Sequence, residues 1–279
     1  MFDRVRSIFE NVSASFQVLS DLHLELNQQY LSFEFPVCAK NLILAGDIGR
    51  LVDYDNYLKF LQKQTGRFEL VFLVLGNHEF YNDTLIAGLQ KSQQLEQEPC
   101  LNGRLVLLHR ARYDVPGTNV TILGCTLWSN VSETAKDIVS MKIQDFGKIQ
   151  DWTVSDHNET HQADLSWLLA EIESIRDSNK TQKAKRSILV VTHHAPSLKE
   201  TSSPQNTKNP WTSAFATDVL SRIPNSSGIK AWVFGHTHYT TDFKLGGIRV
   251  IANQRGYVLP GSNLNGKKDG FDVGKVISL

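Results

Sequence analysis

Side chains that commonly bind metal ions are concentrated directly after a few short apolar segments of this 279-residue chain. Six of the nine histidines lie there, together with two aspartates and an asparagine. These residues are Asp21, His23, Asp47, Asn77, His78, His193, His194, His236 and His238. Carboxylate, amide and imidazole groups together suit Mn²⁺, Fe, Zn²⁺ or Co²⁺, and no cysteine is placed to add a thiolate. The pattern therefore predicts a site for divalent cations.

The charge of this set favours two cations and an anionic substrate. Asp21 and Asp47 contribute two negative charges, whereas imidazole and amide ligands are neutral. Two divalent cations would bring the sum to two positive charges, and a hydroxide between the cations would leave one. A site with residual positive charge suits a phosphate ester. Without cations, so many imidazoles and two carboxylates would have little reason to lie together.

The apolar segments that precede these side chains have the length and composition of buried strands. In an open α/β sheet, ligands bind beyond the carboxyl ends of the strands, so the side chains can converge on one edge. Amphipathic segments between the strands predict helices, and the alternation indicates an α/β fold. The predicted strands are 16–19, 41–45, 70–75, 187–191, 231–234 and 248–252, and the predicted helices are 54–64, 165–175 and 214–223.

The polar turns form five motifs in a fixed order. They are Asp21-Leu22-His23, Gly46-Asp47, Gly76-Asn77-His78-Glu79, Thr192-His193-His194 and Gly235-His236-Thr237-His238. In type and order these motifs resemble those of the calcineurin-like metallophosphoesterases, and the resemblance spans residues 16–253. It implies a four-layer α/β fold, in which two mixed β-sheets pack as a sandwich flanked by helices.

The resemblance also implies a role for each motif residue. Asp21, His23 and His238 would hold one metal ion, Asn77, His193 and His236 would hold the other, and Asp47 would bridge both. A hydroxide between two such cations attacks the phosphorus in line with the leaving group. His78, which the family pattern leaves unligated, would protonate the leaving group, and Glu79 would support the site from behind the ligands.

Three positions leave alternatives open. Either His193 or His194 could be the ligand, and the family pattern favours His193, which leaves His194 as a candidate substrate-binding residue. Arg255 is a second candidate substrate-binding residue, because its guanidinium could meet a phosphate oxygen bidentately, and a structural ion pair is its alternative. Gly49 offers no carboxylate to orient His78, so another acid such as Asp83 is a candidate for that task.

The chain divides into an N-terminal extension, residues 1–14, and one metallophosphoesterase domain, residues 15–279. Polar composition predicts a surface insertion at 130–162, in which Asp145, His157 and His161 are expected to be solvated. This insertion and the loop 199–211 are expected to set the substrate, because loops carry specificity.

Composition narrows the class of substrate and the location. The formal net charge is zero, so no overall basic field draws a long nucleic acid. Three scattered cysteines and the lack of a long apolar run predict a cytoplasmic protein without a membrane anchor. We expect a metal-dependent phosphoric ester hydrolase that acts on a small or modest-sized substrate, with diesters favoured over monoesters.

Two alternatives remain at this stage. A protein Ser/Thr phosphatase is the first, but the turn Ile48-Gly49-Arg50 departs from the Asp and Arg-Gly pattern of that branch. A non-catalytic scaffold of the same fold is the second, and it is disfavoured because all seven ligand positions and His78 are present. The sequence does not indicate an oligomeric state.

Overall fold

Two β-sheets form the centre of the protein in the computed structural model, which describes residues 13–206, 209–224, 227–258 and 270–279. The five-stranded sheet has the order β11-β1-β2-β3-β4, and the six-stranded sheet has the order β5-β6-β7-β8-β10-β9. The first sheet contains β1 (Ser15–Leu19), β2 (Asn41–Ala45), β3 (Leu70–Val74), β4 (Leu105–Leu107) and β11 (Val276–Ser278). The second contains β5 (Ala111–Asp114), β6 (Val120–Cys125), β7 (Ser187–Thr192), β8 (Ile229–Phe234), β9 (Thr241–Leu245) and β10 (Ile248–Ala252).

Both sheets are mixed. The central pairs β1–β2, β2–β3, β3–β4, β6–β7, β7–β8 and β8–β10 are parallel, whereas the edge pairs β1–β11, β5–β6 and β9–β10 are antiparallel. Parallel strands are covered on both faces, which explains why the central segments are almost continuously apolar. Side chains such as Phe16, Ile43, Leu189 and Val233 fill the space between the two sheets.

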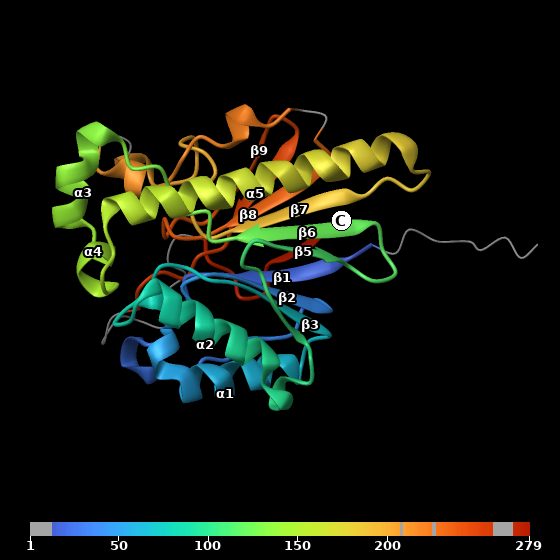
Figure 1. The fold of residues 1–279 in the computed structure, drawn as a ribbon. Coiled ribbons are helices and arrows are strands. Elements are labelled where there is room, and N and C mark those ends of the chain that lie inside the picture. The colour runs from blue at the N-terminus through green and yellow to red at the C-terminus, as the bar shows by residue number, and fades with distance from the viewer. Residues whose placement is uncertain (1–12, 207–208, 225–226, 259–269) are drawn as a thin grey trace, which may run out of the picture.

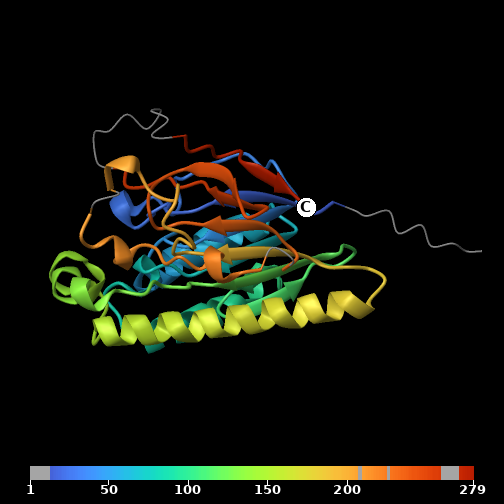
Figure 2. The ribbon, with the colours of Figure 1, turned by 90° about the horizontal axis from the view of Figure 1, so that it is seen from above.

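Helices cover the two outer faces (Figure 1). The first sheet carries α1 (Tyr54–Thr65) and α2 (Leu85–Gln97), and the second carries the long helix α5 (Val154–Thr181). In Figure 2, α5 runs along the length of the second sheet. The predicted sandwich of two mixed sheets flanked by helices is thus confirmed.

Local predictions were right for the strands and wrong in one helix. Segment 54–64 is α1, and segment 165–175 lies inside α5. Segment 214–223 is not an α-helix, because its backbone pairs with another part of the chain. Ala195 donates to the Phe215 carbonyl and accepts from the Thr217 N–H, and Val219 donates to the Pro196 carbonyl. Only short 3₁₀ turns therefore form, at Thr212–Ala214 and Leu220–Arg222.

The segment 130–162 folds into α3 (Lys136–Lys142), α4 (Asp145–Lys148) and the beginning of α5. Thr153 caps α5 in a capping box with Asp156. The prediction that Asp145, His157 and His161 are solvated is wrong, since all three are at most 1% exposed. These three polar groups are therefore buried, whereas most other polar residues of the segment are exposed.

Two further expectations concern the N-terminal extension and the lack of a membrane anchor. Most of the predicted N-terminal extension, residues 1–12, lies outside the described residues, so the boundary at residue 14 stays a prediction. None of the described helices combines the length and the apolar character that crossing a bilayer requires.

Candidate metal centre

The polar turns after β1, β2, β3, β7 and β8 meet at one edge of the sandwich. Five candidate ligands in these turns have positive φ angles, a region that residues with a side chain rarely occupy. They are Asp21 (53°), His23 (47°), Asp47 (52°), His236 (73°) and His238 (51°). Such backbone costs on the order of 1–3 kcal/mol per residue and is concentrated at functional sites. The turns are therefore shaped to aim these side chains and not for stability.

Three motif glycines allow these turns to pack closely. A Cβ atom on Gly76 would lie 2.2 Å from Asp47 Oδ1, and one on Gly46 would lie 2.3 Å from His193 Nδ1. A Cβ atom on Gly235 would lie 2.7 Å from Asp21 Oδ2. Each glycine thus leaves the space that a candidate ligand occupies.

Asp47 lies at the centre of the site. Its Oδ2 is 3.8 Å from His23 Nε2, and its Oδ1 is 3.4 Å from His193 Nε2. Asn77 Oδ1 is 3.1 Å from the same His193 nitrogen, and His193 Nδ1 faces the Ala45 carbonyl at 3.0 Å. Each oxygen of the Asp47 carboxylate therefore faces a different histidine, which is the arrangement expected of a ligand that bridges two cations.

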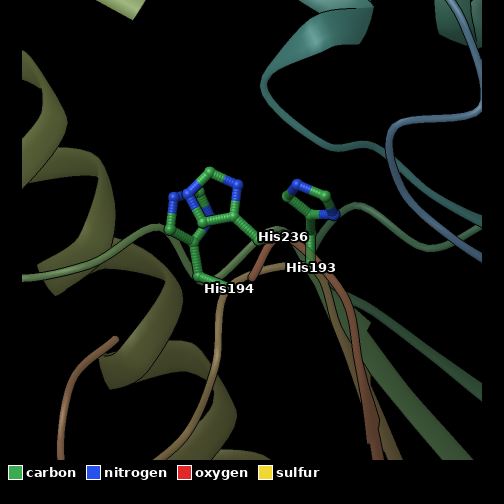
Figure 3. Close-up of side chains that lie close together, drawn as sticks. All are labelled: His193, His194 and His236. Carbon is green, nitrogen blue, oxygen red and sulfur yellow. The ribbon is translucent and has the colours of Figure 1, made fainter. Parts of the chain in front are cut away.

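Most of the predicted ligands fall into two groups of donor atoms, and Asp47 belongs to the first of them. In each group, the candidate ligand atoms all lie within 4.8 Å of one another. One group contains Asp21, His23, Asp47 and His238, and the other contains His193, His194 and His236. Figure 3 shows the second group, in which the rings of His194 and His236 lie beside each other. The structure thus brings all seven predicted metal ligands to one site.

The atoms of the site fit divalent cations better than they fit one another. His23 Nε2 and His238 Nε2 face each other at 2.9 Å, although one proton is all that such a contact can share. Asp21 Oδ2 and His236 Nε2 are buried and find no hydrogen-bond partner among the described residues. Buried polar atoms are normally paired, so these atoms indicate a missing positive group. Divalent cations supply that charge and accept lone pairs from both residue types.

Electrostatics keep several of these imidazoles in the neutral form that binds metals. Burial lowers the pKa of His238 to about 3, with His23 as a further cause, and burial also holds the pKa of His236 well below its usual value. Burial opposes protonation of His193 too, but Asp47 and Asp21 raise its pKa to about 10. A cation beside His193 can replace that proton and satisfy the same carboxylates.

His78 lies beside this set and is held on both sides of its ring. Its Nδ1 is 2.8 Å from Glu25 Oε1, and its Nε2 is 3.1 Å from the hydroxyl of Tyr257. Tyr257 as a whole residue is 41% exposed. The ring of His78 stacks on Tyr81 with the centroids 4.1 Å apart. His78 Nε2 thus faces a side chain that is in contact with solvent.

Glu25 is the acidic partner that sequence reasoning missed. Asp83, the candidate considered for this task, instead pairs with Lys91. Glu25 is 9% exposed and also faces His23 Nδ1 at 3.4 Å. A signal was present, because Glu25 continues the alternation that starts at Asp21 and His23, two residues apart each time.

Glu79 supports the site from behind. Its buried carboxylate accepts hydrogen bonds from the backbone N–H groups of Asp47 (2.9 Å), Ile48 (2.8 Å), Gly49 (3.3 Å) and Gly76 (2.6 Å). The Tyr57 hydroxyl donates a fifth bond at 3.0 Å. One side chain therefore fixes the turn that carries Asp47 to the turn that carries Asn77.

The two candidate substrate-binding residues lie in different surroundings. His194 is fully buried, and its ring lies 3.9 Å from that of His236, so it belongs to the wall of the site. Arg255 donates to the Leu22 carbonyl at 3.0 Å and to Gln29 at 2.7 Å, and its guanidinium lies over the Phe33 ring. A substrate-binding role for either residue stays a prediction.

Comparisons with known proteins agree with this geometry. The family model described as calcineurin-like phosphoesterase matches residues 15–240. An uncharacterized protein of Acanthamoeba polyphaga mimivirus, L509, is 29% identical over 273 residues, which covers 88% of this chain and 92% of that protein.

Two solved structures share the fold. A phosphopantetheinyl hydrolase from Mycobacterium tuberculosis superposes with a TM-score of 0.57 at 17% identity, over 88% of this chain and 91% of its own. A dimetal phosphatase from Danio rerio superposes with a TM-score of 0.50 at 14% identity, over 86% of both chains.

Proposed function

Because the chain belongs to the calcineurin-like phosphoesterase family, we propose that it is a phosphoric ester hydrolase that works with two divalent cations. The observation that carries the proposal is the position of Asp47, whose two carboxylate oxygens face His23 and His193. Some donor atoms around it find no hydrogen-bond partner in the part of the chain that the structure describes. The proposed ligands are Asp21, His23, Asp47, Asn77, His193, His236 and His238.

Cations at this site would activate a water molecule as the nucleophile and offset the negative charge that develops on the phosphate. Mn²⁺, Fe, Zn²⁺ and Co²⁺ all suit the donor set. The protein supplies the arrangement: the strained turns aim the ligands, and Glu79 holds the Asp47 turn in place. The burial of the ligands keeps bulk water from weakening these interactions.

His78 is the proposed general acid. Glu25 accepts a hydrogen bond from Nδ1, which keeps one proton on that nitrogen. Burial opposes a second proton, but Asp47 and Glu25 raise the pKa of His78 to about 9, so Nε2 carries a proton that it can give to the leaving group. The leaving group then departs as an alcohol rather than as an alkoxide. A positioned acid of this kind contributes roughly 10²–10⁴-fold to the rate.

We propose phosphodiesters of small or modest size as substrates. Arg255 supports this choice, because its guanidinium is occupied by the Leu22 carbonyl and by Gln29. A diester carries one negative charge where a monoester carries two, so it depends less on an arginine at the phosphate. We propose a cytoplasmic location, in keeping with cysteines that are all free in this structure.

Hydrolysis of aryl phosphates tests the proposal. We expect turnover of a bis-aryl phosphate after reconstitution with Mn²⁺, Zn²⁺, Fe²⁺ or Co²⁺, and slower turnover of the mono-aryl ester. His78→Ala should retain the metals but lose roughly 10²–10⁴-fold on esters with poor leaving groups, and much less on esters with good ones. His109→Ala, outside both donor groups, is the matched control. No turnover of either ester with any metal would overturn the proposal.

A further inference from the structure

A buried carboxylate from segment 130–162 lies against one of the proposed metal ligands. Asp145, the first residue of α4, is 1% exposed. Its Oδ1 accepts a hydrogen bond from Asn77 Nδ2 at 2.7 Å and another from the Tyr81 hydroxyl at 2.7 Å. Asn77 Nδ2 is also 3.1 Å from the Tyr81 oxygen, so the three polar groups form a closed triangle.

The opposite end of the Asn77 amide faces the metal centre. Its Oδ1 lies 3.1 Å from His193 Nε2, the nitrogen that also faces Asp47. An amide can be turned by 180° within the same space, and the hydrogen-bonding partners decide which end points where. A cation requires the oxygen, since the NH₂ group has no lone pair to offer.

We propose that Asp145 is a positioning residue for the metal centre, which keeps the Asn77 amide oxygen turned toward the cation. The inference rests on the proposed function. An ionised carboxylate accepts hydrogen bonds and donates none, so Asp145 admits the NH₂ end of Asn77 and excludes the oxygen end. Partners of this kind behind metal ligands fix ligand orientation and raise affinity.

A purely structural role explains Asp145 less well. Burying a carboxylate is unfavourable without a compensating cation, and no ion pair of Asp145 is found among the described residues. Its second oxygen, Oδ2, is buried without a hydrogen-bond partner. An apolar side chain would fill this position at lower cost, so the acid is explained by what it does to Asn77.

The backbone around α4 places Asp145 where this role requires it. Asn82 donates to the Lys148 carbonyl at 2.7 Å, and Gln150 donates to the Asp83 carbonyl at 2.8 Å. These bonds dock the segment on the turn that follows Asn77 and His78. Segment 130–162 therefore contributes to the surroundings of a proposed metal ligand.

The affinity for Mn²⁺ tests the inference without reference to turnover. Asp145→Asn keeps the shape but offers an NH₂ group as well as an oxygen, so the Asn77 amide is free to turn. In calorimetric titrations of the full chain, we expect one of two Mn²⁺ sites to weaken by roughly 10–100-fold and the other to remain unchanged. Asp164→Asn is the matched control, since buried Asp164 binds Arg110 and the Leu127 N–H and touches no proposed ligand.

A paired exchange separates orientation from stability. Asn77→Asp alone should lose the second Mn²⁺, because two carboxylates would then face each other across a 2.7 Å contact. Adding Asp145→Asn should restore it, since the new amide at 145 can donate to the new carboxylate at 77. Two Mn²⁺ sites of wild-type affinity in Asp145→Asn, or failure of the pair to restore binding, would overturn the inference. A wild-type protein that binds no Mn²⁺ would instead contradict the proposed function.

Discussion

Replacing Glu79 by glutamine tests how the site is held together, because the substitution changes charge and hydrogen bonding but not shape. Oε1 of Glu79 accepts bonds from Ile48, Gly49 and the Tyr57 hydroxyl, and Oε2 accepts bonds from the N–H groups of Asp47 and Gly76. Glutamine keeps one of these oxygens and replaces the other with an NH₂ group. Donors would then face donors at two of the five contacts at least.

The expected loss follows from those two contacts. A buried N–H group that loses its partner costs about 1–3 kcal/mol, so Glu79→Gln should lower the free energy of unfolding by about 2–6 kcal/mol. The Asp47 and Gly76 turns would separate, and Mn²⁺ affinity should fall with them. Burial and the nearby Asp47 raise the pKa of Glu79 to about 7, so the comparison belongs at pH 8, where the wild-type carboxylate is ionised.

Urea denaturation of metal-free protein at pH 8 measures this loss. Glu96→Gln is the matched control, because Glu96 accepts one bond, from the Leu107 N–H at 2.7 Å, and the glutamine oxygen can replace it. The control should change the free energy of unfolding by less than about 1 kcal/mol. If Glu79→Gln unfolds at the same urea concentration as the control, the five contacts do not hold the turns as described.

Three other outcomes follow from the structure. Glu25→Gln should slow the hydrolysis of esters with poor leaving groups by roughly tenfold or more and leave the hydrolysis of esters with good leaving groups nearly unchanged. If kcat/KM falls equally for both kinds of ester, Glu25 does not act through His78. Gly76→Ala places a Cβ atom 2.2 Å from an Asp47 oxygen and should abolish retention of metal on elemental analysis, whereas Gly147→Ala, which meets nothing within 4 Å, should retain it. Burial lowers the pKa of His157 to about 3, below the unfolded value of 6.5. Between about pH 3 and pH 6.5 the native state therefore binds fewer protons than the unfolded state. The free energy of unfolding then falls as pH drops below 6.5, by about 1.4 kcal/mol per pH unit. In metal-free protein, urea unfolding of His157→Gln should therefore show a decline from pH 7 to pH 5 that is about 2 kcal/mol smaller than in wild type, and parallel declines would contradict this account.

The sequence was sufficient for the parts of the site that follow strand ends. Short apolar strands and the turn residues that follow them are local features, so residues such as Asp47 and His193 are assigned to one edge of the sheet by the sequence alone. The parallel arrangement of the central strands then brings these turns together, whatever the loops between them do.

The sequence was insufficient where partners lie far apart along the chain. Glu25 meets His78 across 53 residues, and Asp145 meets Asn77 across 68. The alternation of Asp21, His23 and Glu25 marks Glu25 as a candidate, but no local pattern shows which residues pair. Asp145 was predicted to be solvated because its neighbours are polar, yet the docking of α4 on residues 82–84 buries it. In segment 214–223, pairing with residues 195–196 outweighed helical periodicity, a common result when tertiary contacts compete with local preference.

The central claim is that Asp47 joins two cations into one hydrolytic site. Its most direct test is a titration of chelator-treated protein with Mn²⁺, in which bound metal and hydrolysis of a bis-aryl phosphate are followed in the same samples. Wild type and the exposed-surface control Asp55→Ala should bind two equivalents and gain turnover as the second one binds. Asp47→Ala should bind at most one and remain inactive. Full turnover without metal, or an Asp47→Ala protein that binds two equivalents and hydrolyses the ester at the wild-type rate, would contradict the claim.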